Sequence, residues 1–338
     1  MKKIILLILV ITASAQIKAQ SVSWTVLKDN PLDHRNFTAC IDPLFIDING
    51  NNGYTFGWGA RAEYMMGKLF LMNFDFRSGF GTNGYKISDK NTKNYTYLEG
   101  GIGIIFSKSQ YSKHVPIVLS QSSSTSYGYG YSVTTTTTKY IRGGVPAKHL
   151  SIWAFRAGLI SMSNSLNYKN LADSLVKFKG NGSDFTFKDS VGNKHFQTGF
   201  GALTTVSLYG GIHSRIIRQL QIDVDGWGYR ENSRYKDVYL DLLFAPVISI
   251  TDFTSAGKTY DVQYDKVSHF GWRMGFANRH PKDQGFNFKF EFGVRPGPKA
   301  QDNKAMVNFK NWYCMFTYAL YFPMKIKPTF EDQKRTAE

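Results

Sequence analysis

The chain has 338 residues, a formal net charge of +16 at pH 7, and a composition that is 42% hydrophobic and 15% aromatic. Beyond its N-terminus, no apolar run approaches the roughly 20 residues that a spanning helix needs, which excludes a bundle of transmembrane helices. Only two cysteines are present, which excludes a fold held by a disulfide framework. The 26 Phe, 20 Tyr and 31 Gly residues favour a membrane β-barrel, in which every second residue faces lipid and aromatic side chains gather at both interfaces.

The first residues have the layout of a secretory signal peptide. Lys2 and Lys3 precede the apolar run IILLILVITASA, and the stretch QIKAQ follows it. A basic start, a hydrophobic middle and a small residue before the cleavage point are the shared features of export signals. The sequence therefore predicts a cleaved signal over residues 1–20 and a lead-in over residues 21–36. A permanent anchor is the alternative, but the apolar run is short for a spanning helix.

Strong alternation begins after the lead-in. Between residues 56 and 80, large apolar side chains take nearly every second position, and Gly, Arg, Glu, Asn and Asp take many of the others. Because side chains of a strand alternate between two faces, this pattern predicts strands with one oily and one polar face. The Met66-Gly67-Lys68 stretch in the middle predicts a tight hairpin turn.

The same alternation returns near the C-terminus. Its clearest form is FNFKFEFGVR, from Phe286 to Arg295, and residues 270–276 and 312–322 follow it too. Each of these segments is expected to be a strand. Weaker strands are expected at residues 37–48, 95–106, 151–163, 200–213, 219–229 and 236–247.

These segments number roughly 11, and barrels of this class usually have an even strand count. The sequence predicts an all-β fold, a transmembrane antiparallel up-and-down β-barrel of about 12 strands over residues 37–324, with 10 or 14 as alternatives. Further strands would come from residues 115–120 and 134–142, which flank the polar segment SQSSSTSYGYGYSVTTTTT. The charged residues 325–338 are expected to form a tail beyond the last strand.

The aromatic hairpins FGWGARAEYMMGKLFLMNFDFRSGF and FGWRMGFANRHPKDQGFNFKFEFGV, with a signal that ends in KAQ, resemble outer-membrane barrel proteins of the Bacteroidota. The resemblance covers nearly the whole mature chain and consists of generic alternation. It implies an integral outer-membrane protein of a Gram-negative bacterium, and it brings no catalytic residues with it.

The barrel assigns each strand residue to one of two faces. Because a charge in the lipid-facing band costs several kcal/mol, charged side chains are expected to point inward. The expected lumen-facing charges are Arg61, Glu63, Asp75, Arg77, Arg156, Asp223, Asp225, Asp241, Arg273, Lys289 and Glu291. The expected lipid-facing residues are Phe70, Phe74, Phe76, Phe270, Trp272, Phe286, Phe288, Phe290, Phe292, Trp312 and Phe316.

Two features of the expected barrel stay open. Charges of both signs occur on most strands, which favours a blocked or narrow lumen over a water-filled one. Cys40 and Cys314 fall in the expected first and last strands, which must pair to close the wall. A disulfide between them and two free thiols are both compatible with the sequence, because bridge geometry is demanding.

Catalytic chemistry finds little support. A barrel hydrolase needs a His near a Ser or a carboxylate, but in His213-Ser214 and Ser268-His269 the paired residues are adjacent and point to opposite faces of a strand. No His or Cys cluster has metal-ligand spacing, and no glycine group has the context of a phosphate loop. The sequence predicts a protein that is not an enzyme and has no cofactor, with a lipid-acting hydrolase as the weaker alternative.

Two functions remain. The first is an accessory or structural subunit of an outer-membrane assembly, secretion or uptake complex, favoured by the mixed-charge lumen, the basic loops and the tail. The second is a passive channel for small hydrophilic solutes, favoured by the same lumen charges. The expected partners are outer-membrane lipid, including anionic surface lipid, and other outer-membrane or periplasmic proteins. Nucleic acid is not expected, because the basic residues form no single stripe and the chain is exported.

Overall fold

The computed structural model describes residues 22–49, 53–80, 95–167, 177–180, 183–186, 200–250, 253–255, 258–260, 266–280, 284–299 and 311–326. The expected signal peptide and most of the expected tail lie outside these ranges. None of the described residues forms a helix of the length and apolar character needed to span a membrane. The chain divides into two compact units. We call them the barrel unit (Pro31–Tyr111, His149–Arg218 and Arg234–Glu338) and the small unit (Met1–Asn30, Ser112–Lys148 and Gln219–Ser233).

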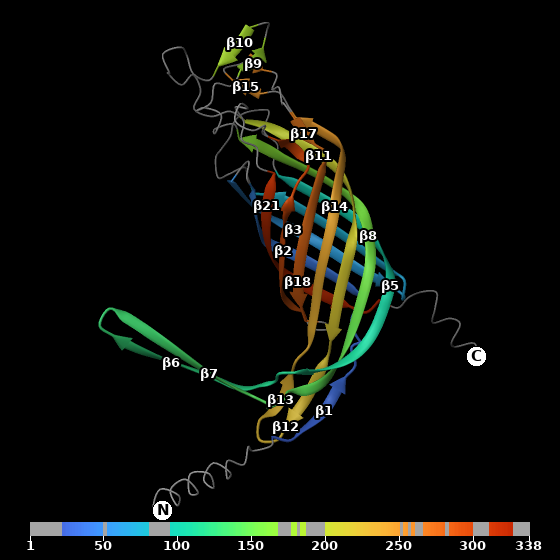
Figure 1. The fold of residues 1–338 in the computed structure, drawn as a ribbon, viewed down its shortest axis with the longest axis vertical. Helices are drawn as coiled ribbons and strands as arrows, with labels where there is room; N and C mark the ends of the chain where they lie inside the picture. The colour runs from blue at the N-terminus through green and yellow to red at the C-terminus, as the bar shows by residue number, and fades with distance from the viewer. Residues whose placement is uncertain are drawn as a thin grey trace, which may run out of the picture. The chain divides into compact units, whose positions relative to one another are not determined.

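Ten strands close into an antiparallel barrel in the barrel unit (Figure 1). The prediction of an all-β closed barrel is confirmed, and its strand count is ten, the lower alternative, instead of twelve. The order around the wall is β11 (Phe200–Arg218), β14 (Arg234–Ile250), β18 (Phe270–Arg279), β19 (Gly285–Val294), β21 (Trp312–Met324), β2 (Phe37–Asn49), β3 (Gly53–Met66), β4 (Phe70–Gly79), β5 (Thr96–Val115) and β8 (Val145–Asn167).

The alternating sequence forms the two faces of this wall. In β19, for example, Phe286 and Phe288 are exposed on the outside, while Lys289 and Glu291 are buried on the inside. The β3–β4 turn starts after Met66, which pairs with Phe70. Gly67 has a φ of 61°, in the left-handed region that glycine adopts without a steric penalty.

Three segments that were considered as barrel strands lie in the small unit instead. Residues 219–229 contribute β12 (Leu220–Val224) and the start of β13 (Gly228–Glu231), which form a sheet with β1 (Trp24–Asp29) in the order β1-β12-β13. Most of residues 115–120 and 134–142 fall in β6 (Val118–Gly128) and β7 (Tyr131–Tyr140), which pair only with each other. The wall closes without them, which accounts for the difference between twelve strands and ten.

The small unit has an apolar core. It consists of nine buried side chains, among them Leu220, Ile222 and Val224 on β12, with Trp24 and Trp227 packed against them. The β6–β7 hairpin extends from this unit as an exposed ribbon of Ser, Thr and Tyr (Figure 1). At its tip, Tyr129 is fully exposed. The sequence did not predict this unit.

Three short two-stranded sheets complete the described residues. They are β9 (Lys177–Gly180) with β10 (Ser183–Thr186), β15 (Phe253–Ser255) with β16 (Lys258–Tyr260), and β17 (Lys266–Ser268) with β20 (Gly297–Lys299).

Cys40 and Cys314 are free thiols. Their strands, β2 and β21, do pair, but the register places Cys40 opposite Tyr321 and Cys314 opposite Ile48. The two cysteines are therefore far apart along neighbouring strands, because each residue advances a strand by about 3.4 Å. A bridge between them is incompatible with this register.

Candidate functional site

The inside of the barrel is a dense array of charges. Among the described residues, eight basic and eight acidic side chains of the barrel strands and their ends form ion pairs there. Equal numbers of both signs allow every buried charge to be compensated, as a low-dielectric interior requires. The basic residues are Arg61, Arg77, Arg156, Arg215, Arg273, Arg279, Lys289 and Arg295, and the acidic residues are Asp42, Asp47, Glu63, Asp75, Glu99, Asp237, Asp241 and Glu291.

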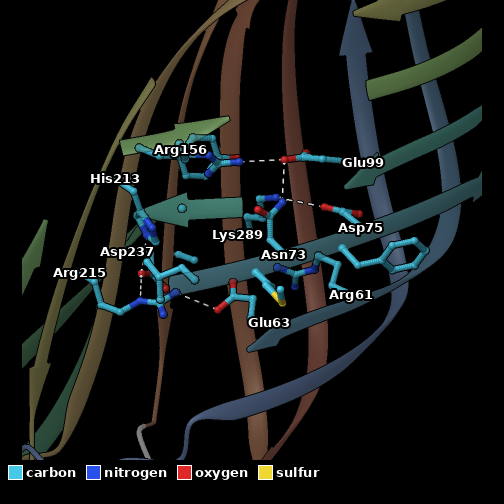
Figure 2. A pocket seen from close by; sticks show the side chains of 16 residues that line it. Arg61, Glu63, Asn73, Asp75, Glu99, Arg156, His213, Arg215, Asp237 and Lys289 are labelled. Atoms are coloured by element: carbon cyan, nitrogen blue, oxygen red, sulfur yellow. Dashed lines mark hydrogen bonds and ion pairs between the residues drawn. The ribbon is translucent and has the colours of Figure 1, made fainter. Parts of the chain in front are cut away.

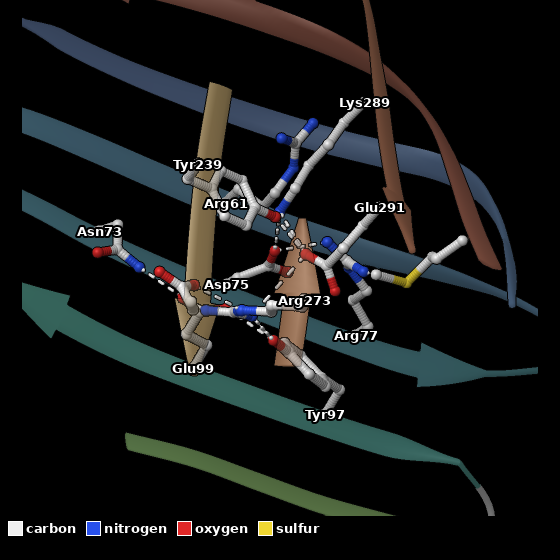
Figure 3. A network of polar contacts seen from close by, with 12 residues as sticks. Arg61, Asn73, Asp75, Arg77, Tyr97, Glu99, Tyr239, Arg273, Lys289 and Glu291 are labelled. Atoms are coloured by element: carbon white, nitrogen blue, oxygen red, sulfur yellow. Dashed lines mark hydrogen bonds and ion pairs between the residues drawn. The ribbon is translucent and has the colours of Figure 1, made fainter. Parts of the chain in front are cut away.

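Arg273 on β18 is the centre of one network (Figure 3). Its Nη1 and Nη2 atoms donate to the two carboxylate oxygens of Glu99 at 2.7 and 2.8 Å, and its Nε donates to Asp241 at 2.7 Å. Tyr97 donates its hydroxyl proton to Glu99 at 2.6 Å. Because β14, β11 and β8 separate β18 from β5 around the wall, the Arg273–Glu99 pair crosses the lumen.

A second crossing lies beside the first. Lys289 on β19 is 3.2 Å from the Asp75 carboxylate on β4, and Arg77 reaches the same carboxylate oxygen at 2.5 Å. Three strands separate β19 from β4 around the wall. Glu291 accepts hydrogen bonds from the hydroxyls of Tyr239 and Tyr313. This part of the lumen is therefore bridged by both ion pairs and tyrosine side chains.

A third group surrounds a small cavity (Figure 2). Glu63 on β3 accepts from Arg215 at 2.9 Å and from Arg279 at 2.6 Å, two residues that lie on strands across the lumen from β3. Asp237 accepts from Arg215 Nε at 2.6 Å and lies 2.8 Å from His213 Nε2. The space open to the centre of a water molecule is about 60 Å³, enough for a few waters and too small for most solutes.

Tyrosine rings fill much of the space between the charges. The guanidinium carbon of Arg273 lies 4.6 Å from the centroid of the Tyr209 ring, and that of Arg156 lies 4.4 Å from the centroid of Tyr239. Gly275 leaves room for one of these rings, because a Cβ at that position would overlap Tyr239. The cation–π contacts hold the arginines in place across the lumen.

The structure places nine of the eleven expected lumen charges inside the barrel, where they take part in these networks. Asp223 and Asp225 are a correction, because both lie outside the barrel in the small unit. Asp223 is exposed on β12, and Asp225 accepts a hydrogen bond from the Ser23 hydroxyl. Alternation placed them on one face of a strand, but that strand pairs with β1 and β13.

The sequence did not single out several residues that carry the networks. Glu99 was missed because glycines interrupt the alternation around it, and Asp42 and Asp47 were missed because β2 changes register between Ile41 and Leu44. The inward position of Arg215, Asp237 and Arg279 could have been predicted, because each lies an even number of residues from an inward-facing side chain of its own strand. Arg295 directly follows β19.

The expected lipid-facing residues lie on the outer face of the wall. Phe270 is 69% exposed and Phe286 62% exposed. Phe74, Phe288, Trp272, Trp312 and Phe316 are also exposed, while Phe70, Phe76, Phe290 and Phe292 are partly covered by their neighbours. Several pack in aromatic pairs along the outside, such as Phe290 with Phe316 at a centroid distance of 4.8 Å.

The two histidines considered for catalysis have different surroundings. His213 lies in the lumen beside Asp237, and its neighbour Ser214 lies on the opposite face of β11. His269 Nδ1 lies 2.6 Å from the backbone oxygen of Ala245. Within the part of the chain that the structure describes, no group of three or more His, Cys, Asp and Glu side chains is arranged to hold a metal ion.

No protein-family model matches the chain. No curated protein sequence matches it. Among solved structures, the chain is similar to OmpT, an outer-membrane protein of Vibrio cholerae, at 9% identity and a TM-score of 0.18, over 88% of this chain and 99% of that one. A likeness of this size carries no argument about activity.

One expectation from the sequence is corrected. The sequence predicted a protein that is not an enzyme, and a likeness to an outer-membrane protein gives no support to that exclusion. We therefore withdraw the exclusion of catalysis. The Bacteroidota resemblance stays a prediction from the sequence.

Proposed function

We propose that the protein is an integral outer-membrane barrel with a closed lumen, acting as an accessory or structural subunit of a membrane assembly, secretion or uptake complex. The observation that carries this proposal is the set of ion pairs across the lumen. Arg273–Glu99, Lys289–Asp75 and Arg279–Glu63 each join strands from different sides of the wall.

The membrane location is supported by the outer face of the barrel. A closed barrel leaves no unpaired strand edge in hydrocarbon, and its outer residues are the apolar ones. Leu242, for example, is 70% exposed and lies midway along the outer face of β14. The signal peptide expected over residues 1–20 accounts for export to that membrane.

Two observations support the accessory role, namely the ion pairs that cross the lumen and the exposed β6–β7 ribbon of the small unit. Within the described residues, ion pairs cross the lumen and narrow the space left for solutes, so passage of substrate is not its best-supported task. The small unit adds the β6–β7 ribbon, whose backbone and Ser and Thr side chains are open to a partner. A barrel with ion pairs across its lumen and an exposed β6–β7 ribbon fits the role of a complex subunit better than the role of a pore.

Two experiments test the proposal. In planar bilayers, the purified protein is expected to be silent in repeated insertions, and stepwise conductance would favour the channel alternative. After gentle solubilisation, the wild-type protein is expected to co-purify with defined partners. A variant with residues 118–140 replaced by a short Gly-Ser linker is expected to lose them, while Arg142→Gln retains them. A wild-type protein that is always a lone monomer would contradict the proposal.

A further inference from the structure

The β6–β7 ribbon has backbone groups open along both of its edges (Figure 1). Among the described residues, β6 and β7 pair only with each other, from Ser120 opposite Lys139 to Gly128 opposite Tyr131. All of residues 121–137 are exposed. Each edge strand of a sheet carries a row of N–H and C=O groups without a strand partner, and a two-stranded ribbon by itself is only marginally stable in water. A further strand along one edge would therefore stabilise the ribbon.

The ribbon lacks the features that normally keep the edges of two sheets apart. Proteins protect an edge with charged side chains, especially Lys, with Pro, or with a β-bulge. Residues 121–138 contain no Asp, Glu, Lys, Arg or Pro. The register shift between Val118 and Ser120 lies at the base of the ribbon, before this stretch begins. The backbone of the ribbon is therefore open to strand pairing along most of its length.

The two edges differ in their capacity to pair. In β7, eight of the ten residues are Thr, Val or Tyr, whereas in β6 only three of the eleven residues are. These residue types are enriched in strands, because their side chains pack well on a pleated surface. Thr hydroxyls can also bond to one another across strands, as the Thr125 and Thr134 hydroxyls do at 3.0 Å within the ribbon. The edge of β7 is therefore the better template for a further strand.

The distribution of charge indicates which strand that is. The chain has a formal net charge of +16, and like-charged copies of a protein repel each other. Residues 114–138 contain no charged Asp, Glu, Lys or Arg side chain, so the repulsion between two copies is least where their ribbons meet. An uncharged edge offers no attraction to an acidic or a basic partner. Because a Thr hydroxyl both donates and accepts, an identical Thr strand complements the edge of β7.

We infer that β7 pairs with β7 of a second copy of this chain, antiparallel and about a two-fold axis. With the axis at Thr136, the middle of the run of five threonines, residues 134–138 of the two copies lie opposite one another, Thr against Thr throughout. Such an interface uses the same edge on both copies, so the assembly closes as a dimer with one four-stranded sheet. The β6 edges remain open to other subunits. The inference does not depend on the accessory role proposed above.

Lysines placed on the two edges test which edge pairs. The full chain in detergent is expected to be a dimer by analytical ultracentrifugation. Thr135→Lys with Thr137→Lys places two pairs of like charges across the axis and is expected to weaken the dimer about tenfold. The matched control is Ser124→Lys with Ser122→Lys, at the direct cross-strand partners of these threonines on β6. It adds the same charge to the other edge and should leave dimer affinity within about twofold of the wild type.

Opposite charges should restore the pairing. Thr135→Glu with Thr137→Glu is expected to weaken its own dimer about tenfold, like the lysine variant. Mixing the glutamate and lysine variants, each with a different affinity tag, is expected to give a mixed dimer of about wild-type affinity. General damage to the small unit would not be repaired by such mixing. Circular dichroism of each variant checks that the strands have formed.

A cysteine on the axis locates the pairing without added charge. In a background with Cys40→Ser and Cys314→Ser, Thr136→Cys places two thiols opposite each other. Residues opposite on antiparallel strands have Cα atoms about 4.5–5.5 Å apart, within the range of a disulfide. Mild oxidation is expected to link the two copies. Ser123→Cys, the cross-strand partner of Thr136 on β6, is expected to stay unlinked.

Several outcomes would overturn the inference. One is a monomeric wild type, which leaves the accessory role intact if other partners still co-purify. A second is a dimer that persists in the Thr135→Lys and Thr137→Lys variant, which would indicate contact elsewhere on the chain. A third is equal loss in the two lysine variants, or equal cross-linking at residues 123 and 136, which would indicate that β7 is not the pairing edge.

Discussion

The two compact units of this chain distribute polar and apolar side chains in opposite ways. The inside of the barrel holds paired charges such as Arg273 and Glu99, which are nearly inaccessible, while large apolar residues such as Leu242 are exposed on its outside. The small unit buries Leu220 and Ile222, and its β6–β7 ribbon presents Ser and Thr to its surroundings. Both units are built from strands with the same alternation.

With the proposed membrane location, the difference follows from the solvent that each surface meets. In water the hydrophobic effect drives apolar side chains inward, and this accounts for the small unit. In hydrocarbon there is no such drive, and an outward charge costs several kcal/mol, so the barrel places its charges inside. Alternation alone therefore reveals a strand with two unlike faces, and the solvent decides which face turns inward.

The largest effect is expected from breaking the lumen network. Arg273→Ala leaves Glu99 and Asp241 buried without their main cationic partner, a loss of about 3–5 kcal/mol in the free energy of unfolding. Urea unfolding in lipid vesicles measures it. Arg142→Ala, at an exposed arginine of the small unit, is expected to change stability by less than about 0.5 kcal/mol. Equal effects of the two substitutions would contradict the assignment.

A substitution in the apolar core should affect the small unit alone. Ile222 is fully buried, so Ile222→Ala is expected to cost about 2–5 kcal/mol there through lost contacts and a cavity. Hydrogen exchange of the β12 amides should quicken, while that of β19 stays slow. Val26→Ala, at an exposed residue of the same sheet, serves as the control. Faster exchange in both units would mean that they unfold as one.

An arginine scan separates surfaces that meet lipid from those that meet water. Leu242→Arg places a charge on the outer face of the barrel and is expected to cost about 2–4 kcal/mol in a bilayer. Leu27 in the small unit is similarly exposed, at 58%, and Leu27→Arg should change stability by less than about 0.5 kcal/mol. Denaturant unfolding of both variants gives the comparison. Similar costs at the two leucines would remove the distinction between the units.

A pH effect is expected at His34, which precedes β2. Burial lowers the pKa of His34 to about 4, and its Nδ1 lies 3.0 Å from the Pro31 carbonyl oxygen. In the unfolded chain His34 binds a proton near pH 6.5, whereas in the folded chain it binds one only near pH 4. The contribution of neutral His34 to the free energy of unfolding is therefore fully present above pH 6.5 and is lost as the pH falls toward 4. His34→Asn should reduce the acid loss by up to about 3 kcal/mol. Unfolding curves at pH 7.5 and 4.5 measure it, and parallel losses in both proteins would contradict the shift.

The barrel was the predictable part of the fold. Segments such as Phe286 to Arg295 alternate without interruption, and each became a wall strand. Residues 219–229 alternate too, but they form part of a half-buried sheet in the small unit. An apolar alternation with a period of two residues does not distinguish a lipid-facing strand from a water-facing one. The assumption of an even strand count then raised the expected number of barrel strands to twelve.

The lumen was only partly predictable. The two-residue alternation places Arg273, Lys289 and Glu291 on the inner face, but it does not predict which charged residue across the lumen each one pairs with. That depends on the strand order and register that bring β18 opposite β5. Glu99 joins the network through this geometry, and no local pattern in the sequence marks it. The small unit was missed because its strands come from three distant segments.

Spin labels on β19 test the central claim most directly. Single cysteines at each position from 285 to 294, in a background with Cys40→Ser and Cys314→Ser, would carry the label in reconstituted bilayers. Oxygen is expected to reach labels at even positions, such as 286, 288 and 290, while a polar nickel reagent does not, because these positions face hydrocarbon. Labels at odd positions should be shielded from both. Equal access of the nickel reagent to even positions, or no period of two, would contradict a membrane barrel with an ion-paired interior.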